Sequence, residues 1–329
     1  MKMETFLLFD EGYFYRTWGN FAFVEKFHKL APPNQKIGEA WLISDREEYE
    51  SKVTEGTYKG KTLNELVRMF PKEIYGENLA KRYKGKRFPL LLKLIDANEI
   101  LSVQVHPSDE IAKKLGERDG GKTEMWYILE AKMNSFIYLG LQRGVKKEHL
   151  LKEIRNQGDV ERLLNKIYVK PGDYFLLPAG TIHAIGPGIV LAEIQQNSNI
   201  TYRLYDWNRI DSDTGKPRVL HLDKAMEAVS EGGKSISVPR LELHREFGLE
   251  KFLCSCPFFN VKLFNVEKPA NIWERNDSFH IVFAIRNTFL EYDNEEKIVK
   301  MGEAILIPAL STREIRVKKG EFLDYYING

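Results

Sequence analysis

Four side chains of this sequence offer nitrogen and oxygen donors that suit one metal ion. They are Gln104, His106, Glu124 and His183. Two neutral imidazoles, one carboxylate and one carboxamide suit zinc or another borderline divalent metal, and no thiolate is offered. A zinc ion in this set would keep a formal charge of about +1, since only Glu124 is anionic. The set therefore predicts a Lewis-acidic centre rather than a structural zinc site.

The first two donors belong to a short strand-like segment. Gln104 and His106 project to one face of an extended strand, and Val103 and Val105 project to the other. A polar face beside an apolar one is typical of a strand that lines a wet cavity. Taken singly, the pattern also fits a solvent-facing strand with an unrelated histidine, and Glu124 also fits an exposed position. The metal site is predicted from the four donors taken together.

His183 stands in a turn that the chain nearly repeats. Residues 171–185 read PGDYFLLPAGTIHAI, and residues 301–315 read MGEAILIPALSTREI, with Arg313 in place of the histidine. The first copy resembles the second signature of the cupin fold, an antiparallel β-barrel whose histidine points inward to a metal. Pro187 stands where that signature usually has an asparagine. The resemblance implies two jelly-roll barrels, of which one can bind a metal.

Length and pattern agree with a mainly β protein of two cupin domains and a few added helices. A chain of 329 residues exceeds the usual size of a single core. The polar, glycine-paired segment 230–239 is the best linker. We therefore expect a catalytic metal-binding domain over residues 1–235, with N-terminal strands and helical insertions, and a second, metal-free cupin-like domain over residues 236–329.

Hydrophobic periodicity predicts the elements of the first domain. Alternating apolar and polar residues predict strands over residues 90–94, 101–105, 125–129, 136–139, 174–177 and 189–194. Helical spacing of apolar residues predicts helices over residues 62–70, 146–165 and 222–229. Gly158 and Asp159 should break the middle one into two short helices, with Asp159 as the N-cap of the second.

Composition limits the partners that the chain could have. There are 49 basic and 47 acidic residues, a formal net charge of +2, and no long run of one sign. Neither a nucleic-acid surface nor a membrane-spanning segment is indicated. Cys254 and Cys256 are the only cysteines and make neither a disulfide framework nor a zinc site. We expect a reduced, cytoplasmic protein.

Several longer segments together resemble the type I mannose-6-phosphate isomerases, specifically their shorter bacterial form. The segments are FPLLLKLIDANEILSVQVHP, GGKTEMWYIL, LPAGTIHAIGPG and EIQQNSNITYRLYDWNR, joined by Trp18-Gly19 and GEAWLISD. Two departures occur: Asn20 stands where the family often has a second glycine, and Arg46-Glu47-Glu48 replaces a common His-Pro-Asn. Both lie outside the predicted metal site, although they could alter contacts with substrate.

The resemblance implies roles for individual residues. It places the metal ligands at His106, Glu124 and His183, with Gln104 as the fourth ligand of longer members. It places the active-site arginine at Arg203. It also implies that three further residues approach the sugar phosphate, namely Lys93, Ser102 and Lys122. Lys93 could instead be a snorkelling strand lysine, and Arg203 could instead pair with Asp206 or Glu193.

The implied activity interconverts mannose 6-phosphate and fructose 6-phosphate through an enediol or enediolate, with one Zn²⁺ per chain. A metal on the sugar oxygens would stabilise the developing charge together with Arg203. The proton-transferring base stays open between Glu193, a zinc-bound hydroxide and a lysine. The implied partner is a small sugar phosphate, and the oligomeric state does not follow from the sequence.

Two other functions remain open at this stage. One is a sugar-phosphate-binding cupin without turnover, which would not need a cationic centre facing an arginine. The other is a different metal-dependent cupin enzyme, such as an iron oxygenase. Those enzymes usually show His-x-His with a nearby Glu, whereas Gln104 replaces the first histidine here.

Overall fold

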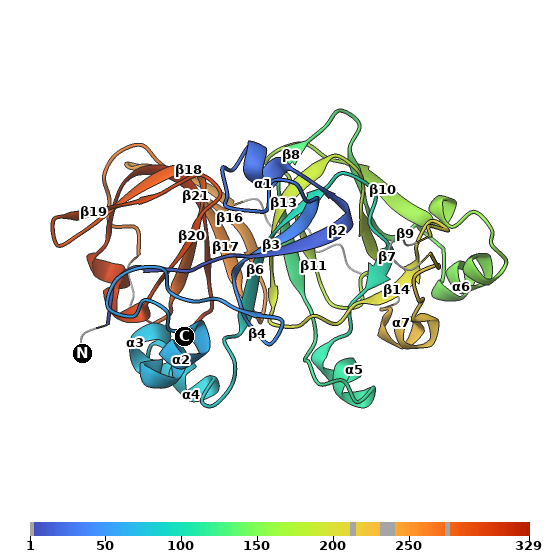
Figure 1. The fold of residues 1–329 in the computed structure, drawn as a ribbon, viewed down its shortest axis with the longest axis horizontal. Helices are drawn as coiled ribbons and strands as arrows, with labels where there is room; N and C mark the ends of the chain where they lie inside the picture. Colours follow the sequence, from blue (N-terminus) through green and yellow to red (C-terminus); the bar gives the residue numbers. More distant parts are fainter. Residues whose placement is uncertain (1–2, 211–214, 231–240, 274–276) are drawn as a thin grey trace. The chain divides into compact units, whose positions relative to one another are not determined.

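A computed structural model describes residues 3–210, 215–230, 241–273 and 277–329. Strands dominate it and helices are few and short (Figure 1), so the prediction of a mainly β protein is confirmed. The strands are β1 Leu7–Leu8, β2 Gly12–Asn20, β3 Ile37–Ile43, β4 Asp45–Arg46, β5 Tyr49–Glu50, β6 Leu90–Ala97, β7 Val103–Val105, β8 Glu124–Ala131, β9 Phe136–Leu141, β10 Leu164–Tyr168, β11 Tyr174–Leu177, β12 His183–Ile185, β13 Ile189–Gln196, β14 Tyr202–Tyr205, β15 Leu241–Arg245, β16 Gly248–Ser255, β17 Asn260–Val266, β18 His280–Tyr292, β19 Glu295–Val299, β20 Ala304–Ile307 and β21 Arg316–Tyr326.

The helices are α1 Ala22–Glu25, α2 Leu63–Met69, α3 Pro71–Tyr75, α4 Glu77–Arg82, α5 Asp109–Lys114, α6 Lys147–Arg155 and α7 Leu222–Ala228, with 3-10 turns η1 Glu161–Leu163 and η2 Ala309–Glu314. Among the residues described, no helix is long and apolar enough to cross a bilayer. The break after α6 is confirmed, but Asp159 is not the N-cap of a second α-helix. Val160 holds the cap position of η1 without a side-chain bond.

The chain forms two compact units. A central unit, named for its place in the sequence, comprises residues 13–40 and 92–236, and a terminal unit comprises residues 1–12, 41–91 and 237–329. The sequence assigned residues 1–12 and 41–91 to the first domain instead. Strand β1 belongs to the terminal unit because Leu7 and Leu8 pair with Leu306 and Ile305 of β20. The expected boundary after residue 235 and the linker, apart from Ser230, lie outside the described residues.

Two antiparallel sheets build the central unit. One has the strand order β10-β9-β12-β7-β14, and the other has the order β11-β8-β13-β6-β3-β2. A core between them draws on both, including Trp126 and Leu191 of the second sheet and Ile137 and Ile185 of the first. Strands β6 and β13 are almost entirely buried, and so is the first part of β8, which explains their largely apolar sequences.

A separate core covers the other face of the five-stranded sheet. Helices α6 and α7 contribute Leu150 and Ala225 to it, and β7 contributes Val103 and Val105. The predicted alternation along β7 is thereby confirmed, because both valines pack under helices while Gln104 lies on the opposite face. This division leaves the inner face of β7 free to carry polar side chains.

The terminal unit is built on one eight-stranded antiparallel sheet. Its main path is β1-β20-β18-β21-β17-β16-β15, and β19 pairs with β18. Its core includes four fully buried side chains, Ile281, Phe283, Ile305 and Ile307. His280 is also buried, and its Nδ1 lies 2.8 Å from Asp324 Oδ1. This histidine is therefore a hydrogen-bonded interior residue.

Candidate metal centre and active site

Two histidines of the central unit are held in one tautomer by the backbone. His106 Nδ1 lies 2.7 Å from the carbonyl oxygen of Ile200, and His183 Nδ1 lies 2.9 Å from that of Thr181. A carbonyl oxygen only accepts hydrogen bonds, so each Nδ1 must carry a proton and donate it. Each Nε2 therefore presents a lone pair, which is the form in which imidazole binds a metal.

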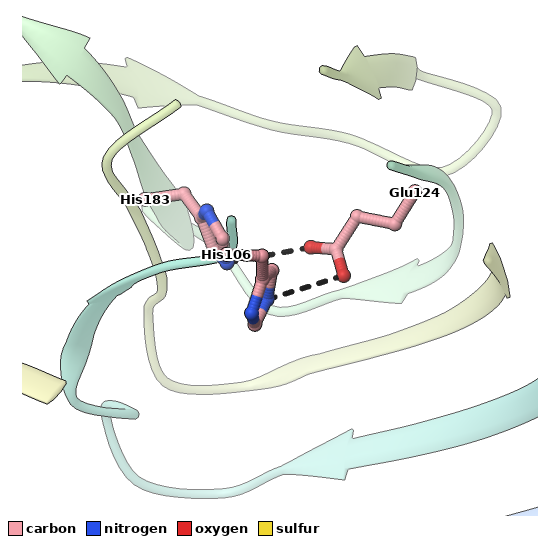
Figure 2. Close-up of side chains that lie close together, drawn as sticks. All are labelled: His106, Glu124 and His183. Atoms are coloured by element: carbon pink, nitrogen blue, oxygen red, sulfur yellow. Dashed lines mark ion pairs between the residues drawn. The ribbon is translucent and has the colours of Figure 1, made fainter. Parts of the chain in front are cut away.

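Those lone pairs converge on one carboxylate (Figure 2). Glu124 Oε1 lies 3.3 Å from His183 Nε2, and Glu124 Oε2 lies 3.4 Å from His106 Nε2. Glu124 is fully buried, and its two oxygens have no hydrogen bond of good geometry. Facing acceptors in a dry interior are unfavourable without a cation beside them; the ammonium of Lys122 lies at Glu124 Oε2, and a metal ion could lie between all three side chains. Within the described part of the chain, this is the group of His, Cys, Asp and Glu that could hold a metal.

Gln104 lies beside this group. It is the cross-strand partner of His183 between β7 and β12 and of Arg203 between β7 and β14. Its Nε2 lies 3.2 Å from His183 Nε2. Rotation of the amide about its last side-chain bond would present the oxygen instead, so Gln104 is placed where a fourth ligand could reach the same ion.

Gly180 fixes the turn that carries His183. Its N–H donates to the carbonyl oxygen of His106 over 2.7 Å, which ties the two histidine segments together. The residue has φ +88°, and an added Cβ would lie 2.8 Å from Ser230 Cβ and 3.0 Å from the carbonyl oxygen of Ala228. Both the backbone angle and the lack of space require glycine. The Pro-x-Gly motif thus sets the position of the metal-binding ring.

A buried lysine lies against the same carboxylate. Lys122 Nζ is 2.8 Å from Glu124 Oε2 and 3.2 Å from His106 Nε2. Burial opposes the charged form of Lys122, but the charges of Glu124 and Glu193 outweigh it and raise its pKa. Burial would raise the pKa of Glu124, yet Lys122 and the histidines hold it well below its ordinary value. Glu124 is therefore ionised, as a metal ligand would have to be.

A second layer of charge surrounds Lys93. Its Nζ lies 3.6 Å from Glu39 Oε2 and 3.9 Å from Glu193 Oε1. Trp126 Nε1 donates to Glu193 Oε2 over 2.8 Å. Lys93 is only 4% exposed, and its ammonium stays inside the unit, so it is not a snorkelling surface lysine. Burial lowers the pKa of Lys93 and, together with the charge of Glu124, raises that of Glu193.

Two contributors to this layer were not predicted from the sequence. Glu39 Oε1 accepts from Arg16 Nε over 2.8 Å, so Arg16, Glu39 and Lys93 form a chain of alternating charge. The available signal was a glutamate inside the largely apolar run 37–43, since a buried carboxylate needs a partner. Its partner could not be identified, because Arg16 lies on the neighbouring strand β2.

A cavity of about 280 Å³ adjoins the metal-binding group. Among the residues that line it are the predicted Lys93, Ser102, Gln104, Lys122 and Arg203. Arg16, Glu39, Glu193, Asn199, Thr201 and Arg218 also contribute polar groups. The structure therefore gathers every predicted site residue at or beside one hollow of the central unit, although they come from segments up to about a hundred positions apart.

Arg203 is held so that one side of its guanidinium stays available. Nη1 donates to the carbonyl oxygen of Val219 over 2.9 Å, while the buried Nε has no acceptor among the described residues. Asp206, the structural partner considered from the sequence, accepts from Arg209 and Arg218 instead. A buried, unsatisfied guanidinium N–H beside a cavity suits an oxyanion that arrives with a ligand.

The metal-free protein should lose stability on acidification below the ordinary histidine range. Burial, reinforced by the charge of Lys122, lowers the pKa of His106 to about 3. In the unfolded chain a histidine titrates near ~6.5, so between these values the unfolded state binds more protons and the free energy of unfolding falls as pH falls. From about pH 7 to pH 5, the free energy of unfolding measured with urea should fall by about 2 kcal/mol more for the chelated protein than for His106→Gln. Parallel pH profiles for the two proteins would contradict this.

Known proteins are similar to this chain over most of its length. A family model described as phosphomannose isomerase type I, catalytic domain, matches residues 7–127. The chain is 38% identical over 307 residues to the mannose-6-phosphate isomerase ManA of Bacillus subtilis, with 92% of each chain covered. It is 36% identical over 278 residues to a mannose-6-phosphate isomerase of Streptococcus mutans, with 84% of each covered. The crystal structure of a mannose 6-phosphate isomerase from Bacillus subtilis matches with a TM-score of 0.89 at 33% identity, covering 98% of this chain and 99% of that one.

Proposed function

The chain belongs to the type I phosphomannose isomerases, and we propose that it interconverts mannose 6-phosphate and fructose 6-phosphate at the His106–Glu124–His183 centre. The observation that carries the proposal is the convergence of two imidazole lone pairs and a buried carboxylate beside a cavity lined by lysine and arginine. A sugar-phosphate-binding cupin without turnover is not favoured, because the relatives that match most of this chain are named as isomerases.

We propose Zn²⁺, one per chain, as the ion of this centre, held by His106, Glu124, His183 and Gln104. The donor set fits, because it offers nitrogen and oxygen ligands, one ionised carboxylate and no thiolate. When bound, such an ion supplies Lewis-acid stabilisation of negative charge that develops on an oxygen of the open-chain sugar. The other steps fall to side chains of the protein.

The ammonium groups of Lys93 and Lys122 and the hydroxyl of Ser102 are proposed to hold the anionic substrate. Both lysines are buried at the cavity, so a phosphate that reaches them meets charge in a poorly solvated site, where it binds strongly. Arg203 offers its unsatisfied Nε to the oxyanion of the enediolate. In this proposal the two lysines and Ser102 bind the substrate, and Arg203 and the metal centre stabilise the transition state.

Glu193 is our choice for the base that moves a proton between C1 and C2. It lines the cavity, and Trp126 fixes one of its oxygens, which leaves Oε1 facing the two lysines. Burial raises its pKa toward the range in which a carboxylate can both take and return a proton. The isomerisation requires both transfers.

A coupled assay for fructose 6-phosphate formed from mannose 6-phosphate tests the proposed function. The purified protein is expected to turn over mannose 6-phosphate. This activity should disappear after prolonged chelation and return on addition of Zn²⁺, because the C–H group of the sugar is too weak an acid to ionise without charge stabilisation. A chelated protein shown to be metal-free that still turns over at the original rate would refute the metal-dependent mechanism. Absence of turnover in the metal-loaded protein would refute the isomerase itself.

A further inference from the structure

The terminal unit holds a cavity of about 710 Å³, larger than the one at the metal-binding group. Its size falls within the range of small-molecule sites, roughly 300–1,000 Å³. Strands β15, β16, β17, β18 and β21 all contribute to its wall. The proposed isomerase chemistry uses none of these strands, so the cavity has no role in the function proposed above.

The wall is one face of the sheet. On β16 the lining residues are Glu250 and Phe252, and on β17 they are Lys262 and Phe264, so each strand contributes alternate positions. The register continues this face across the sheet, because Phe252 pairs with Lys262 and Lys262 pairs with Asp324 of β21. The polar residues of the cavity are thus neighbours on adjoining strands.

These polar side chains form a network of two hydrogen-bonded groups, one around Glu250 and one around Asp324. Lys262 Nζ lies 2.8 Å from Glu250 Oε1, and Arg245 Nε lies 2.9 Å from Glu250 Oε2. Asp324 accepts from Trp273 Nε1 over 3.1 Å, and His280 Nδ1 lies 2.8 Å from its other oxygen. Glu250 and Asp324 are only 6% and 1% exposed. Buried carboxylates on a sheet face are costly to desolvate, and apolar residues would form a more stable core.

Aromatic rings flank the network. The His280 ring stacks on Tyr326 at a centroid distance of 5.2 Å and contacts Trp273 at 5.5 Å. Lys262 Nζ lies 4.4 Å from the ring centroid of Phe252. Phe252 and Tyr326 are half-buried at the cavity, so each has ring surface that a ligand could cover. Flat apolar surfaces beside fixed donors and acceptors suit a ring-shaped ligand that has both apolar C–H faces and polar edges.

We propose that this cavity binds a neutral carbohydrate, a hexose or a short oligosaccharide. Each sugar hydroxyl both donates and accepts, so it matches a wall that offers carboxylate acceptors together with ammonium and guanidinium donors. The half-buried aromatic rings can cover the C–H face of the pyranose ring. The proposal goes beyond the isomerase activity, since it assigns a second ligand site to the terminal unit.

Charge argues that the ligand is not a sugar phosphate. The wall holds the three acidic side chains of Glu250, Asp277 and Asp324 against the two basic side chains of Arg245 and Lys262. Both cations already share Glu250. A phosphate would therefore meet no uncommitted cation among the described lining residues, whereas a neutral sugar adds no charge.

Calorimetric titration of the full-length, metal-loaded protein tests the proposal, with mannose, glucose and a mannose disaccharide as probes. We expect one or more of them to bind with a dissociation constant on the order of 1 mM or below. Phe252→Ala and Lys262→Ala should each weaken binding by roughly tenfold, because an aromatic ring and a charged donor in the wall of a site can carry much of its affinity. Lys251→Ala is the matched control, since Lys251 lies on the same strand as Phe252 but does not line the cavity.

The active-site cavity is the alternative location for a bound sugar. Repeating the titration in saturating fructose 6-phosphate distinguishes the two sites, because binding in the terminal unit should persist. Loss of the signal under that condition, equal affinity in both cavity variants and the control, or no binding of any of the three sugars would overturn the proposal. Isomerase turnover, measured separately on the same proteins, tests the proposed function independently.

Discussion

Replacement of His183 by alanine should abolish both the metal and the activity while leaving the protein folded. His183 supplies one of the lone pairs that face Glu124, and its ring lies on the short strand β12 next to Gln104. Without it the centre loses one of its two imidazoles, and Gln104, His106 and Glu124 leave it short of the four ligands typical of a protein zinc site. We expect less than a tenth of a metal equivalent and a loss of turnover of at least ~1,000-fold, since both the ion and the charge stabilisation it supplies are removed.

The measurement is metal analysis after gel filtration, followed by the coupled assay and circular dichroism. His149→Ala is the matched control, because His149 belongs to the same unit but is exposed on α6. It should keep the full metal content and turnover. Retention of a whole equivalent of zinc by His183→Ala would remove His183 from the ligand set, and an unfolded spectrum would call for His183→Gln in its place.

Arg203→Lys should lower turnover far more than it raises the Michaelis constant. The guanidinium Nε of Arg203 is buried beside the cavity and has no acceptor in the described part of the chain, so the bond it can make is available to a ligand. If that ligand oxygen gains charge in the transition state, the interaction strengthens there and contributes to kcat. A lysine keeps the charge but loses the planar fork, and a loss of about 100-fold in kcat is expected.

Steady-state kinetics on the metal-loaded variant checks this expectation, with Arg143→Lys at an exposed position as the control. Metal content must be equal in the two variants, so that an effect on the centre is separated from an effect on the substrate. A kcat within twofold of the parent protein would return Arg203 to a structural role. A rise in the Michaelis constant alone would make it a binding residue.

Much of the local structure could be predicted, because it depends on patterns that are short in sequence. Alternation along residues 103–106 predicted which side chains of β7 share a face, and the Pro-x-Gly turn predicted where His183 would stand. The mainly β cupin fold is confirmed by the match to a solved isomerase structure. Positions of the candidate ligands followed from the same motifs, and the structure brings His106, Glu124 and His183 together.

What could not be predicted depends on partners that are distant along the chain. Leu7 and Leu8 form a strand too short to indicate its neighbour, so the assignment of the N-terminal segment to the terminal unit was missed. Glu39 and Arg16 lie on adjoining strands, and neither shows its pairing in the sequence. Asp206 is as close in sequence to Arg203 as to Arg209, yet it pairs with Arg209 and with the more distant Arg218. Proximity in sequence is a poor guide to ion pairs.

The two orienting bonds of the metal-binding histidines end on backbone carbonyl oxygens, those of Ile200 and Thr181. Every residue type carries such an oxygen, so no single substitution at position 181 or 200 removes the acceptor. A change of side chain at Ile200 or Thr181 therefore leaves in place the acceptor that fixes the tautomer of each ring. Among homologues, these two positions should be free to vary in side chain, while insertions or deletions in the loops that carry them should be rare.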